Sequence, residues 1–303
     1  MAVYNAGPFL RPAIEGVIAQ DFEDWELIAI DDHSTDGSFE QLKSFRDERI
    51  RILRNETNKG NVYTRNRGIG EARGELVAMH DHDDISDPRR LGRQVRFLTR
   101  HTAYGMVGTG FWRMDASGAA YRRVTVPASD IAICRTMVTS NPISSGSVMI
   151  RRRLVQHLGG YREFFPAEDY DLWIRVAQVA LIANLPDALY YWRIHDRAAS
   201  STRSVQQEQV ARSLRDQIQQ RWLDEAHYVG GAGLDSGIPE RVTRYARARA
   251  RACVSPVGQS RPRRLMFFAG MSCPALRAGE SAGLLLGDGF RLGADAVRRR
   301  FHR

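Results

Sequence analysis

Residues 76–84 read LVAMHDHDD, so a short apolar run ends abruptly in acidic and imidazole side chains. The apolar part has the composition of a buried strand. Three carboxylates at one strand end concentrate negative charge, which a hard divalent cation such as Mg²⁺ or Mn²⁺ can offset. A metal-bound phosphate is therefore the predicted ligand. The alternative, a cap for the helix that Pro88 opens, suits Asp87 and leaves the other three carboxylates unexplained.

Strands and helices are predicted to alternate through the first part of the chain. Strands are expected at residues 25–30, 50–53 and 75–79, and helices at 34–45 and 62–73. Such alternation with short links is typical of a parallel sheet with helices on both faces. Ligands bind such a sheet at the carboxyl ends of its strands. The acidic pair at residues 31–32, which ends the first of these strands, is therefore expected to face the same crevice as residues 81–84.

The composition is that of a globular protein. The chain has 303 residues, of which 43% are hydrophobic, and this suits one α/β domain with an extension, or two small domains. It has no apolar run near the roughly 20 residues of a membrane span and no secretory signal, so a cytoplasmic location is expected. The widely spaced Cys134, Cys253 and Cys273 indicate free thiols rather than disulfides or a zinc site.

Positive charge is concentrated in the last part of the chain. Residues 241–303 contain 14 Arg and no Lys against three acidic residues, a net charge of +11, whereas residues 1–240 carry −2, which together give +9. This pattern predicts peripheral contact with an anionic membrane surface. A solvated Arg-rich helix surface, or a segment without a stable fold, explains it as well. Nucleic acid is not an expected partner, because no nucleic-acid motif accompanies the charge.

Short motifs along roughly the first 200 residues occur in the order found in one enzyme family. They are Val3-Tyr4-Asn5, Gln20 to Leu27, Asp31-Asp32-His33-Ser34-Thr35-Asp36, Asn58-Lys59-Gly60, Thr64-Arg65-Asn66, Asp81-His82-Asp83-Asp84, Asn141-Pro142, Ser147-Val148-Met149, Gly159-Gly160-Tyr161, Glu168 to Trp173 and Tyr191 to His195. Each motif is weak alone, but the ordered set resembles family 2 glycosyltransferases, which transfer sugars from nucleotide donors. The resemblance implies inverting transfer and a GT-A-type α/β fold, with a mostly parallel sheet and helices on both faces.

The resemblance also implies a site for Mn²⁺ or Mg²⁺. Asp81 and Asp83 match the family's DxD pair, with Asp83 the preferred direct ligand and Asp84 in a supporting role. Arg193 and His195 match a late strand-end motif and would reach the diphosphate or the metal. A divalent ion at this position would act as a Lewis acid towards the departing nucleoside diphosphate.

The nucleotide pocket is assigned from the earlier motifs. By its match Asp32 would hydrogen-bond the nucleobase, whereas Asp31 would brace the loop. Tyr4 belongs to the motif that would form a wall of the nucleoside pocket. Arg65 would meet the phosphates or, alternatively, pair with Glu71 or Asp32.

The acceptor side needs a general base that takes the proton of the attacking hydroxyl. Asp169 aligns with the family's catalytic base, and one carboxylate suffices for single displacement. Its neighbour Glu168 is the residue most easily confused with it. Trp173 would stack on an acceptor sugar or, as its helical spacing favours, pack in the core. Residues 144–146 resemble the lining of the acceptor pocket, or form an ordinary turn.

The first predicted strand is short. The family's motif at Val3 ends a buried central strand, and only Ala2 to Tyr4 are present here, against about 5–6 residues in a usual strand. The expectation is either a start site further upstream or a damaged core. In a damaged core the neighbouring strand would lack main-chain partners, and the nucleoside pocket would lack a wall.

These observations predict a catalytic domain at residues 1–225, a Gly-rich linker at 226–240 and a basic, mainly helical or partly disordered extension at 241–303. The expected function is metal-assisted, inverting sugar transfer from a nucleotide-sugar donor to a saccharide or lipid-linked acceptor, in cell-surface polysaccharide or glycolipid synthesis. A non-catalytic nucleotide-binding relative is an open alternative. A sugar nucleotidyltransferase is disfavoured, because residues 5–9 do not form a Gly-rich basic phosphate loop.

Overall fold

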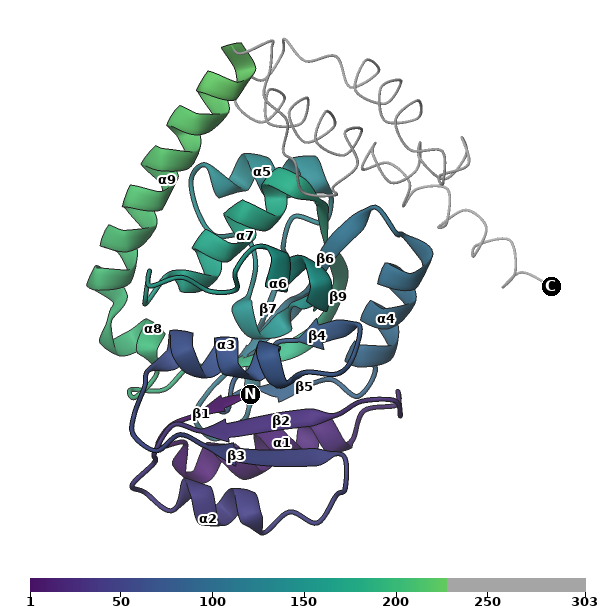
Figure 1. Ribbon diagram of the computed structural model, residues 1–303, viewed down its shortest axis with the longest axis vertical. Helices are drawn as coiled ribbons and strands as arrows, with labels where there is room; N and C mark the ends of the chain where they lie inside the picture. Colours follow the sequence, from purple (N-terminus) through teal and green to yellow (C-terminus); the bar gives the residue numbers. More distant parts are fainter. Residues whose placement is uncertain (228–303) are drawn as a thin grey trace, which may run out of the picture.

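The computed structural model describes residues 1–227, which form an α/β fold with two sheets (Figure 1). The first sheet is parallel, in the order β1-β2-β3, with β1 (Ala2–Val3), β2 (Leu27–Asp31) and β3 (Ile50–Arg54). The second follows the path β4-β8-β6-β9-β5, with β7 paired to β6. Its strands are β4 (Leu76–Ala78), β5 (Ile85–Ser86), β6 (Tyr104–Met114), β7 (Ala120–Val124), β8 (Met149–Arg151) and β9 (Leu181–Arg193).

Helices cover both faces of the first sheet. After the short helix η1 (Gly7–Phe9), α1 (Leu10–Ile18) packs with α2 (Ser38–Lys43) on one face, where Leu10, Ile14 and Leu42 are fully buried. On the other face lies α3 (Asn61–Glu71), with Gly68 beside Ile30 of β2. All five residues of β2 are buried, which is the pattern of a strand covered on both sides.

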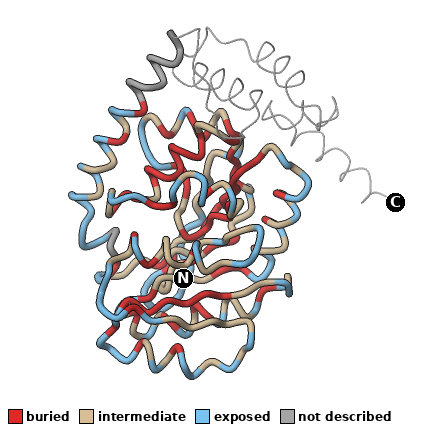
Figure 2. The backbone as a smooth tube through the Cα atoms, viewed as in Figure 1, coloured by how far each residue is buried: buried red, intermediate tan, exposed pale blue. Residues whose placement is uncertain are grey.

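The main hydrophobic core lies beside the second sheet. Its centre is α7 (Glu168–Val179), where nine of the 12 residues are buried, and Figure 2 shows this burial running through α7 and the neighbouring strands. Around it lie α5 (Asp130–Met137), α6 (Arg152–His157) and α9 (Ser204–His227), while α4 (Arg90–Arg100) packs separately through Leu98. The short elements η2 (Ser145–Ser147) and α8 (Ala199–Thr202) complete the described fold. No helix within residues 1–227 combines the length and apolar character needed to span a bilayer.

The predicted α/β class and the alternation through residue 79 are confirmed, but less of the sheet is parallel than predicted. In the second sheet, β4–β8, β5–β9, β6–β7 and β6–β8 are antiparallel, and only β6–β9 is parallel. The chain reverses in the short connection between Met114 and Ala120, and so short a connection permits only an antiparallel pair. The predicted linker, apart from residues 226–227, and the predicted extension lie outside the described residues. Within them, α9 continues to His227, past the predicted boundary.

The short strand β1 is fully paired with β2. Ile30 N donates to Met1 O at 3.0 Å, Asp32 N donates to Val3 O at 2.7 Å, and the amino group of Met1 donates to Ile28 O at 2.8 Å. The expectation that the neighbouring strand lacks main-chain partners is therefore wrong. The carboxyl end of β1 joins that of β2, where the site lies.

Candidate active site

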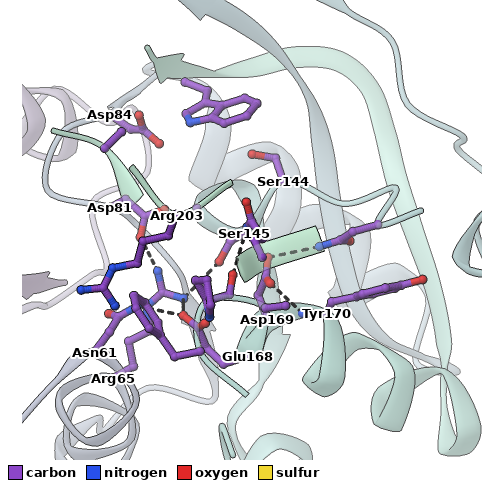
Figure 3. Close-up of a pocket in the computed structure, with 18 of the residues that line it drawn as sticks. Asn61, Arg65, Asp81, Asp84, Ser144, Ser145, Glu168, Asp169, Tyr170 and Arg203 are labelled. Atoms are coloured by element: carbon purple, nitrogen blue, oxygen red, sulfur yellow. Dashed lines mark hydrogen bonds and ion pairs between the residues drawn. The ribbon is translucent and has the colours of Figure 1, made fainter. Parts of the chain in front are cut away.

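A pocket of about 1030 Å³ opens where β1, β2, β4 and β9 end. Its lining comes from residues 58–62, 81–84, 139–146 and the start of α7, segments that are far apart in the chain (Figure 3). Asp32 lines the same pocket as residues 81–84, so the predicted meeting of the two strand ends is confirmed for Asp32 but not for Asp31, which does not line the pocket.

Asp83 and His195 form a close pair on the pocket wall. Asp83 Oδ2 lies 3.0 Å from His195 Nε2, and the imidazole ring packs against Phe9 with centroids 4.5 Å apart. Burial opposes ionisation of this carboxyl group, but the hydrogen bond with His195 and the nearby His82 lower the pKa of Asp83 below its ordinary value. The pair therefore presents an ionised carboxylate next to an imidazole.

Arg65 connects the two sides of the pocket. Its guanidinium donates to Asp81 Oδ1 at 2.7 Å, to Ser145 Oγ at 3.2 Å and to Glu168 Oε1 at 3.4 Å (Figure 3). Burial disfavours its positive charge, but the facing carboxylate of Asp81 raises the pKa of Arg65 above its ordinary value. The alternative pairings with Glu71 or Asp32 are wrong, because those carboxylates bind other partners.

Asp84 and Arg193 are hydrogen-bonded to each other at the acidic segment that follows β4. Asp84 Oδ1 accepts a hydrogen bond from Arg193 N at 2.8 Å. Burial, and then the charges of Asp83 and Asp81, raise the pKa of Asp84 well above its ordinary value. The supporting role predicted for Asp84 agrees with this position.

The prediction that Arg193 contacts the diphosphate is wrong. Its guanidinium donates to the backbone carbonyls of Asp83, Asp115 and Ala116 at 2.7, 3.3 and 3.0 Å. Arg193 is only 3% exposed and does not line the pocket. These contacts hold the β6–β7 connection against the acidic strand end.

Asp32 shapes the loop at residues 58–60, which lines one side of the pocket. Its Oδ1 accepts hydrogen bonds from Asn55 Nδ2 at 2.7 Å and Lys59 N at 2.8 Å, and its Oδ2 accepts one from Gly60 N at 2.8 Å. Tyr4 lines the same end of the pocket and is 46% exposed. An exposed aromatic ring and a fixed acceptor group are thus available to a ligand.

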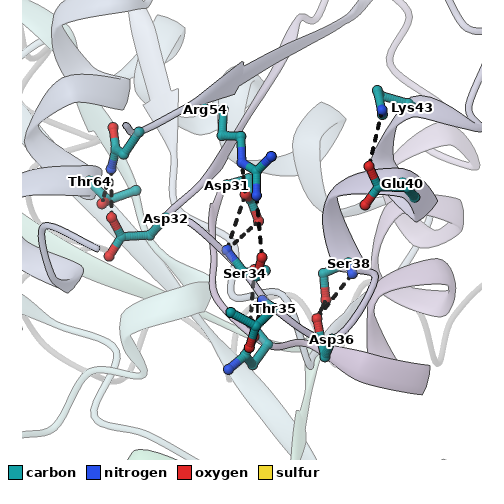
Figure 4. Close-up of polar contacts among 12 residues, drawn as sticks. Asp31, Asp32, Ser34, Thr35, Asp36, Ser38, Glu40, Lys43, Arg54 and Thr64 are labelled. Carbon is teal, nitrogen blue, oxygen red and sulfur yellow. Dashed lines mark hydrogen bonds and ion pairs between the residues drawn. The ribbon is translucent and has the colours of Figure 1, made fainter. Parts of the chain in front are cut away.

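The prediction that Asp31 braces the loop is confirmed. Its carboxylate is fully buried, accepts hydrogen bonds from Ser34 N at 3.2 and 3.3 Å, and pairs with Arg54 Nε at 3.0 Å (Figure 4). Asp31 therefore points away from the pocket and fixes the backbone that positions Asp32.

Asp169 lies at the start of α7, which lines the pocket from a different side than the acidic strand end (Figure 3). Its Oδ1 accepts a hydrogen bond from Tyr170 N at 2.7 Å, and its Oδ2 accepts one from Asn141 Nδ2 at 3.2 Å. Shielding from water, and then the neighbouring charge of Glu168, raise the pKa of Asp169 to about 7. A carboxylate with a pKa near neutrality can accept a proton from a hydroxyl group in general base catalysis.

Trp173 is a core residue. It is fully buried in the main core, its ring meets that of Tyr161 edge-on at 6.4 Å, and it does not line the pocket. The core packing that its helical spacing favoured is therefore confirmed, and the possible stacking of Trp173 on an acceptor sugar is excluded.

Two of the sequence motifs bind each other through a pair of hydrogen bonds. Asn66 Nδ2 donates to Tyr161 O at 2.8 Å, and Tyr161 N donates to Asn66 Oδ1 at 2.8 Å. Gly160 has a φ of +69°, and a Cβ at this position would lie 2.3 Å from Asn66 Oδ1. Glycine is therefore required where α3 meets the segment before α7.

Three pocket residues were assigned no role from the sequence. Asn61 Nδ2 donates to Glu168 Oε1 at 2.8 Å, and Asn141 binds Asp169. Arg203 lies between α8 and α9, with its guanidinium 4.9 Å from the ring of Phe165, and extends towards the side of Asp81 (Figure 3). Asn141 belongs to one of the family-like motifs, but its contact with Asp169 does not follow from the motif. Asn61 and Arg203 lie outside the motifs, so only the fold brings these two residues to the site.

Residues 1–159 match the sequence model of the family described as Glycosyl transferase family 2. EpsE of Bacillus subtilis (strain 168), whose name describes it as a glycosyltransferase, is 36% identical over 197 residues, which are 63% of this chain and 70% of EpsE. The chain belongs to glycosyl transferase family 2. A second relative is the O-antigen biosynthesis glycosyltransferase WbnJ of Escherichia coli. It is 26% identical over 231 residues, which are 74% of this chain and 89% of WbnJ.

Solved structures confirm the GT-A-type fold of this family 2 glycosyltransferase. S. aureus TarS in complex with UDP-GlcNAc has a TM-score of 0.59 at 19% identity, over 91% of this chain and 80% of TarS. The mannosyltransferase PcManGT from Pyrobaculum calidifontis, in complex with GDP-Man and Mn²⁺, has a TM-score of 0.54 at 15% identity, over 96% of this chain and 84% of PcManGT.

The donor set of the glycosyltransferase suits Mg²⁺ or Mn²⁺ at Asp83 and His195. Within residues 1–227 no three His, Cys, Asp or Glu side chains converge as a complete metal site. Such ions are commonly held by one or two protein groups together with substrate phosphates and water. The ionised carboxylate of Asp83 beside His195 fits this arrangement. Asp81 fits less well, because its Oδ1 is engaged by Arg65.

Proposed function

We propose that this glycosyltransferase moves a sugar from a nucleoside-diphosphate donor to a saccharide hydroxyl by metal-assisted single displacement, with inversion. The observation that carries the proposal is the position of Asp169. This carboxylate, with a pKa of about 7, shares one pocket with the Asp83–His195 pair. Single displacement needs a base on the acceptor side and charge compensation on the leaving-group side. Asp169 would supply the base, and the Asp83–His195 pair, by holding a metal ion, would supply the charge compensation.

The donor nucleotide would lie between Tyr4 and the loop at residues 58–60. The exposed ring of Tyr4 would stack on the nucleobase. Asp32 Oδ2 accepts a single protein hydrogen bond and so keeps capacity for a nucleobase N–H. Asp32 would thus contact the base while holding the loop in shape.

The diphosphate would lie beside Asp83, His195 and Arg203. Asp83 and His195 would hold the divalent ion, with Asp81 next to them and Asp84 beneath, and the bound ion would supply Lewis-acid stabilisation of the leaving group. Arg203 replaces Arg193 as the cation that faces the phosphates, because it lines the pocket and forms no ion pair within residues 1–227.

Asp169 would take the proton of the acceptor hydroxyl. Asn141 fixes one oxygen of its carboxylate, and the Tyr170 amide fixes the other. Glu168 keeps the pKa of Asp169 high and is itself held by Asn61 and Arg65. Glu168 is therefore a positioning residue and Asp169 the base.

The proposed pathway is synthesis of a cell-surface polysaccharide or glycolipid, which the name of the relative WbnJ supports. The proposal includes hexosyl transfer and a cytoplasmic enzyme at the inner face of the membrane. Peripheral membrane contact through residues 241–303 rests on sequence charge alone, because these residues lie outside the described part of the chain.

Replacing the carboxylate of Asp83 tests the donor site. Asp83→Asn removes charge at nearly constant shape, so Mn²⁺-dependent nucleotide binding should weaken and turnover should fall by about 10²-fold or more. The measurement is calorimetric nucleotide binding with and without Mn²⁺, together with nucleoside-diphosphate release from a nucleotide-sugar panel. Asp187→Asn, at an exposed ion pair with Arg93, is the control and should behave as wild type. Full activity of Asp83→Asn, or wild-type activity in excess chelator, contradicts the metal assignment.

A further inference from the structure

The pocket continues onto a strand surface formed by β7, β6 and β9. Arg122 lies directly opposite Arg113, and Arg113 directly opposite Trp192. Directly opposed residues on adjacent strands project from the same face of a sheet. These three residues, the Arg–Trp row, therefore share one face, and Trp192 lines the pocket. The row is thus an extension of the pocket floor.

The Arg–Trp row carries two positive charges without carboxylate partners. Within residues 1–227 neither Arg113 nor Arg122 forms an ion pair. The guanidinium of Arg113 lies over the Trp192 ring at 5.4 Å from its centroid, and Arg113 Nε is buried with no hydrogen-bond partner. Asp115, the acid nearest in the chain, is bound within its own turn by Ser117 and Ala119. The row thus lacks an anion that would complete its contacts.

The side chains of the row suit a sugar that carries an oxyanion. Trp192 is held by Arg113 and by an edge-on contact with Phe111 at 5.7 Å, and a fixed indole ring can pack against a sugar ring. Guanidinium groups bind carboxylates and phosphates in paired hydrogen bonds. Phe111 lies two residues before Arg113 and Val124 two residues after Arg122; both line the pocket and connect the row to it.

We propose that the Arg–Trp row is an acceptor subsite for a saccharide that bears an anionic group, a carboxylate or a phosphate, next to the sugar that is glycosylated. This inference rests on the proposed function, because it names the acceptor class of the same site. The anion binds Arg113 and Arg122, and the adjoining sugar packs on Trp192. The accepting hydroxyl is thereby directed towards the interior of the pocket, where Asp169 lies.

The opposite face of β7 provides a matched control. Arg123 is adjacent to Arg122 but projects from the other face, and its guanidinium donates to Pro186 O at 3.2 Å. Arg123→Gln removes the same charge from the same strand without touching the row. Arg122 is exposed, so Arg122→Gln is compatible with folding, and melting curves check this for each variant.

Calorimetric titrations with matched saccharides test the subsite. In the carboxylate arm the full chain is titrated with tetragalacturonate and with its methyl ester, and in the phosphate arm with maltotetraose with and without a phosphate monoester. We expect the charged member to bind about tenfold tighter in at least one arm. Arg122→Gln should reduce this preference, Arg113→Gln with Arg122→Gln should abolish it, and Arg123→Gln should leave it unchanged.

Three results would overturn the subsite. They are equal binding of charged and neutral saccharides in both arms, an unchanged preference in the double variant, and an equal loss in Arg123→Gln. Nucleoside-diphosphate release without acceptor is measured in parallel and should be unchanged in the control Arg123→Gln. If the wild type releases no nucleoside diphosphate from any nucleotide sugar, the proposed function fails, whereas the subsite is still decided by the calorimetry.

Discussion

At the scale of single residues, environment rather than residue type separates the roles of the carboxyl groups. Despite burial, the hydrogen bond with His195 lowers the pKa of Asp83 below its ordinary value. Burial raises the pKa of Asp84 above its ordinary value. The pKa of Asp169 rises to about 7 through shielding and the charge of Glu168. Groups whose pKa values are driven apart in this way are suited to different tasks in one site.

The raised pKa of Asp169 predicts the pH dependence of transfer. The base acts in its deprotonated form, so kcat/KM should fall as the pH decreases through about 7, to roughly one tenth of its plateau at one unit below the pKa. Because Glu168 raises the pKa of Asp169, Glu168→Gln should move this limb to lower pH. Asp169→Asn should bind donor but lose about 10²–10⁴-fold in transfer. If neither substitution changes the fall of kcat/KM at low pH, the group that titrates is not Asp169.

The sequence predicts the location of the functional group better for short polar side chains than for long ones. Asp32, Asp83 and Asp169 sit at motif positions where the backbone fixes the side chain within a few ångströms, and all three line the pocket. Arg193 is at a matching position, but its long side chain ends among carbonyls of the β6–β7 connection. That connection comes from a distant part of the chain, and no local pattern reveals it.

At the scale of elements, small polar contacts determine where helices begin. The helix expected from residue 34 begins at Ser38, because Asp36 Oδ1 accepts a hydrogen bond from Ser38 N at 3.0 Å and Gly37 adopts a φ of +86°. The cap predicted at Asp87 is displaced: Asp87 accepts a hydrogen bond from Arg89 N at 3.0 Å in the turn before α4, whereas the helix itself begins at Arg90 with Arg89 as its N-cap and has no side-chain cap. The three strands predicted at residues 25–30, 50–53 and 75–79 lie within about two residues of β2, β3 and β4, because their apolar runs are bounded by acidic or glycine residues.

The contact between α3 and Gly160 predicts an effect on stability. Gly160→Ala places a methyl group against Asn66 and strains a left-handed backbone, so the free energy of unfolding should fall by about 2–4 kcal/mol. The control is Gly159→Ala, where φ is +76° but the added Cβ meets nothing within 4 Å. Gly159→Ala should lower the free energy of unfolding only by the backbone strain of a positive φ, about 1–2 kcal/mol. Urea unfolding measures the difference, and equal losses contradict the steric role of Asn66.

At the scale of the whole molecule, α9 couples the core to the pocket. Leu214 and Ile218 are buried in the main core, while Gln207 and Arg215 on the same helix line the pocket. This helix is therefore part of the folded unit. The pairing of the second sheet could not be predicted, because β6 meets partners from distant parts of the chain and each pair looks locally like any apolar strand.

Truncating a core residue of α9 tests this coupling. Leu214→Ala should lower the free energy of unfolding by about 2–5 kcal/mol, since it opens a cavity between α9 and α7, and should weaken nucleotide binding as the helix loosens. Val205→Ala, at a residue 72% exposed on the same helix, should change stability by less than about 0.5 kcal/mol. Chemical unfolding and nucleotide titration give both quantities. A stable Leu214→Ala variant means that α9 does not contribute to the core.

The parallel pairing of β6 with β9 also sets the order in which the pocket can assemble as the chain folds. Tyr104 pairs with Leu181, and Arg113 pairs with Trp192. The chain between β6 and β9, which includes several helices, must therefore form a long loop when these two strands pair. The β6–β7 hairpin joins neighbouring segments and can close early, whereas closing a long loop to form a parallel pair is slow. His195 follows β9 and reaches Asp83 only after that strand has docked. A refolding chain is therefore expected to acquire nucleotide affinity in its last kinetic phase, after most of its helical signal has returned.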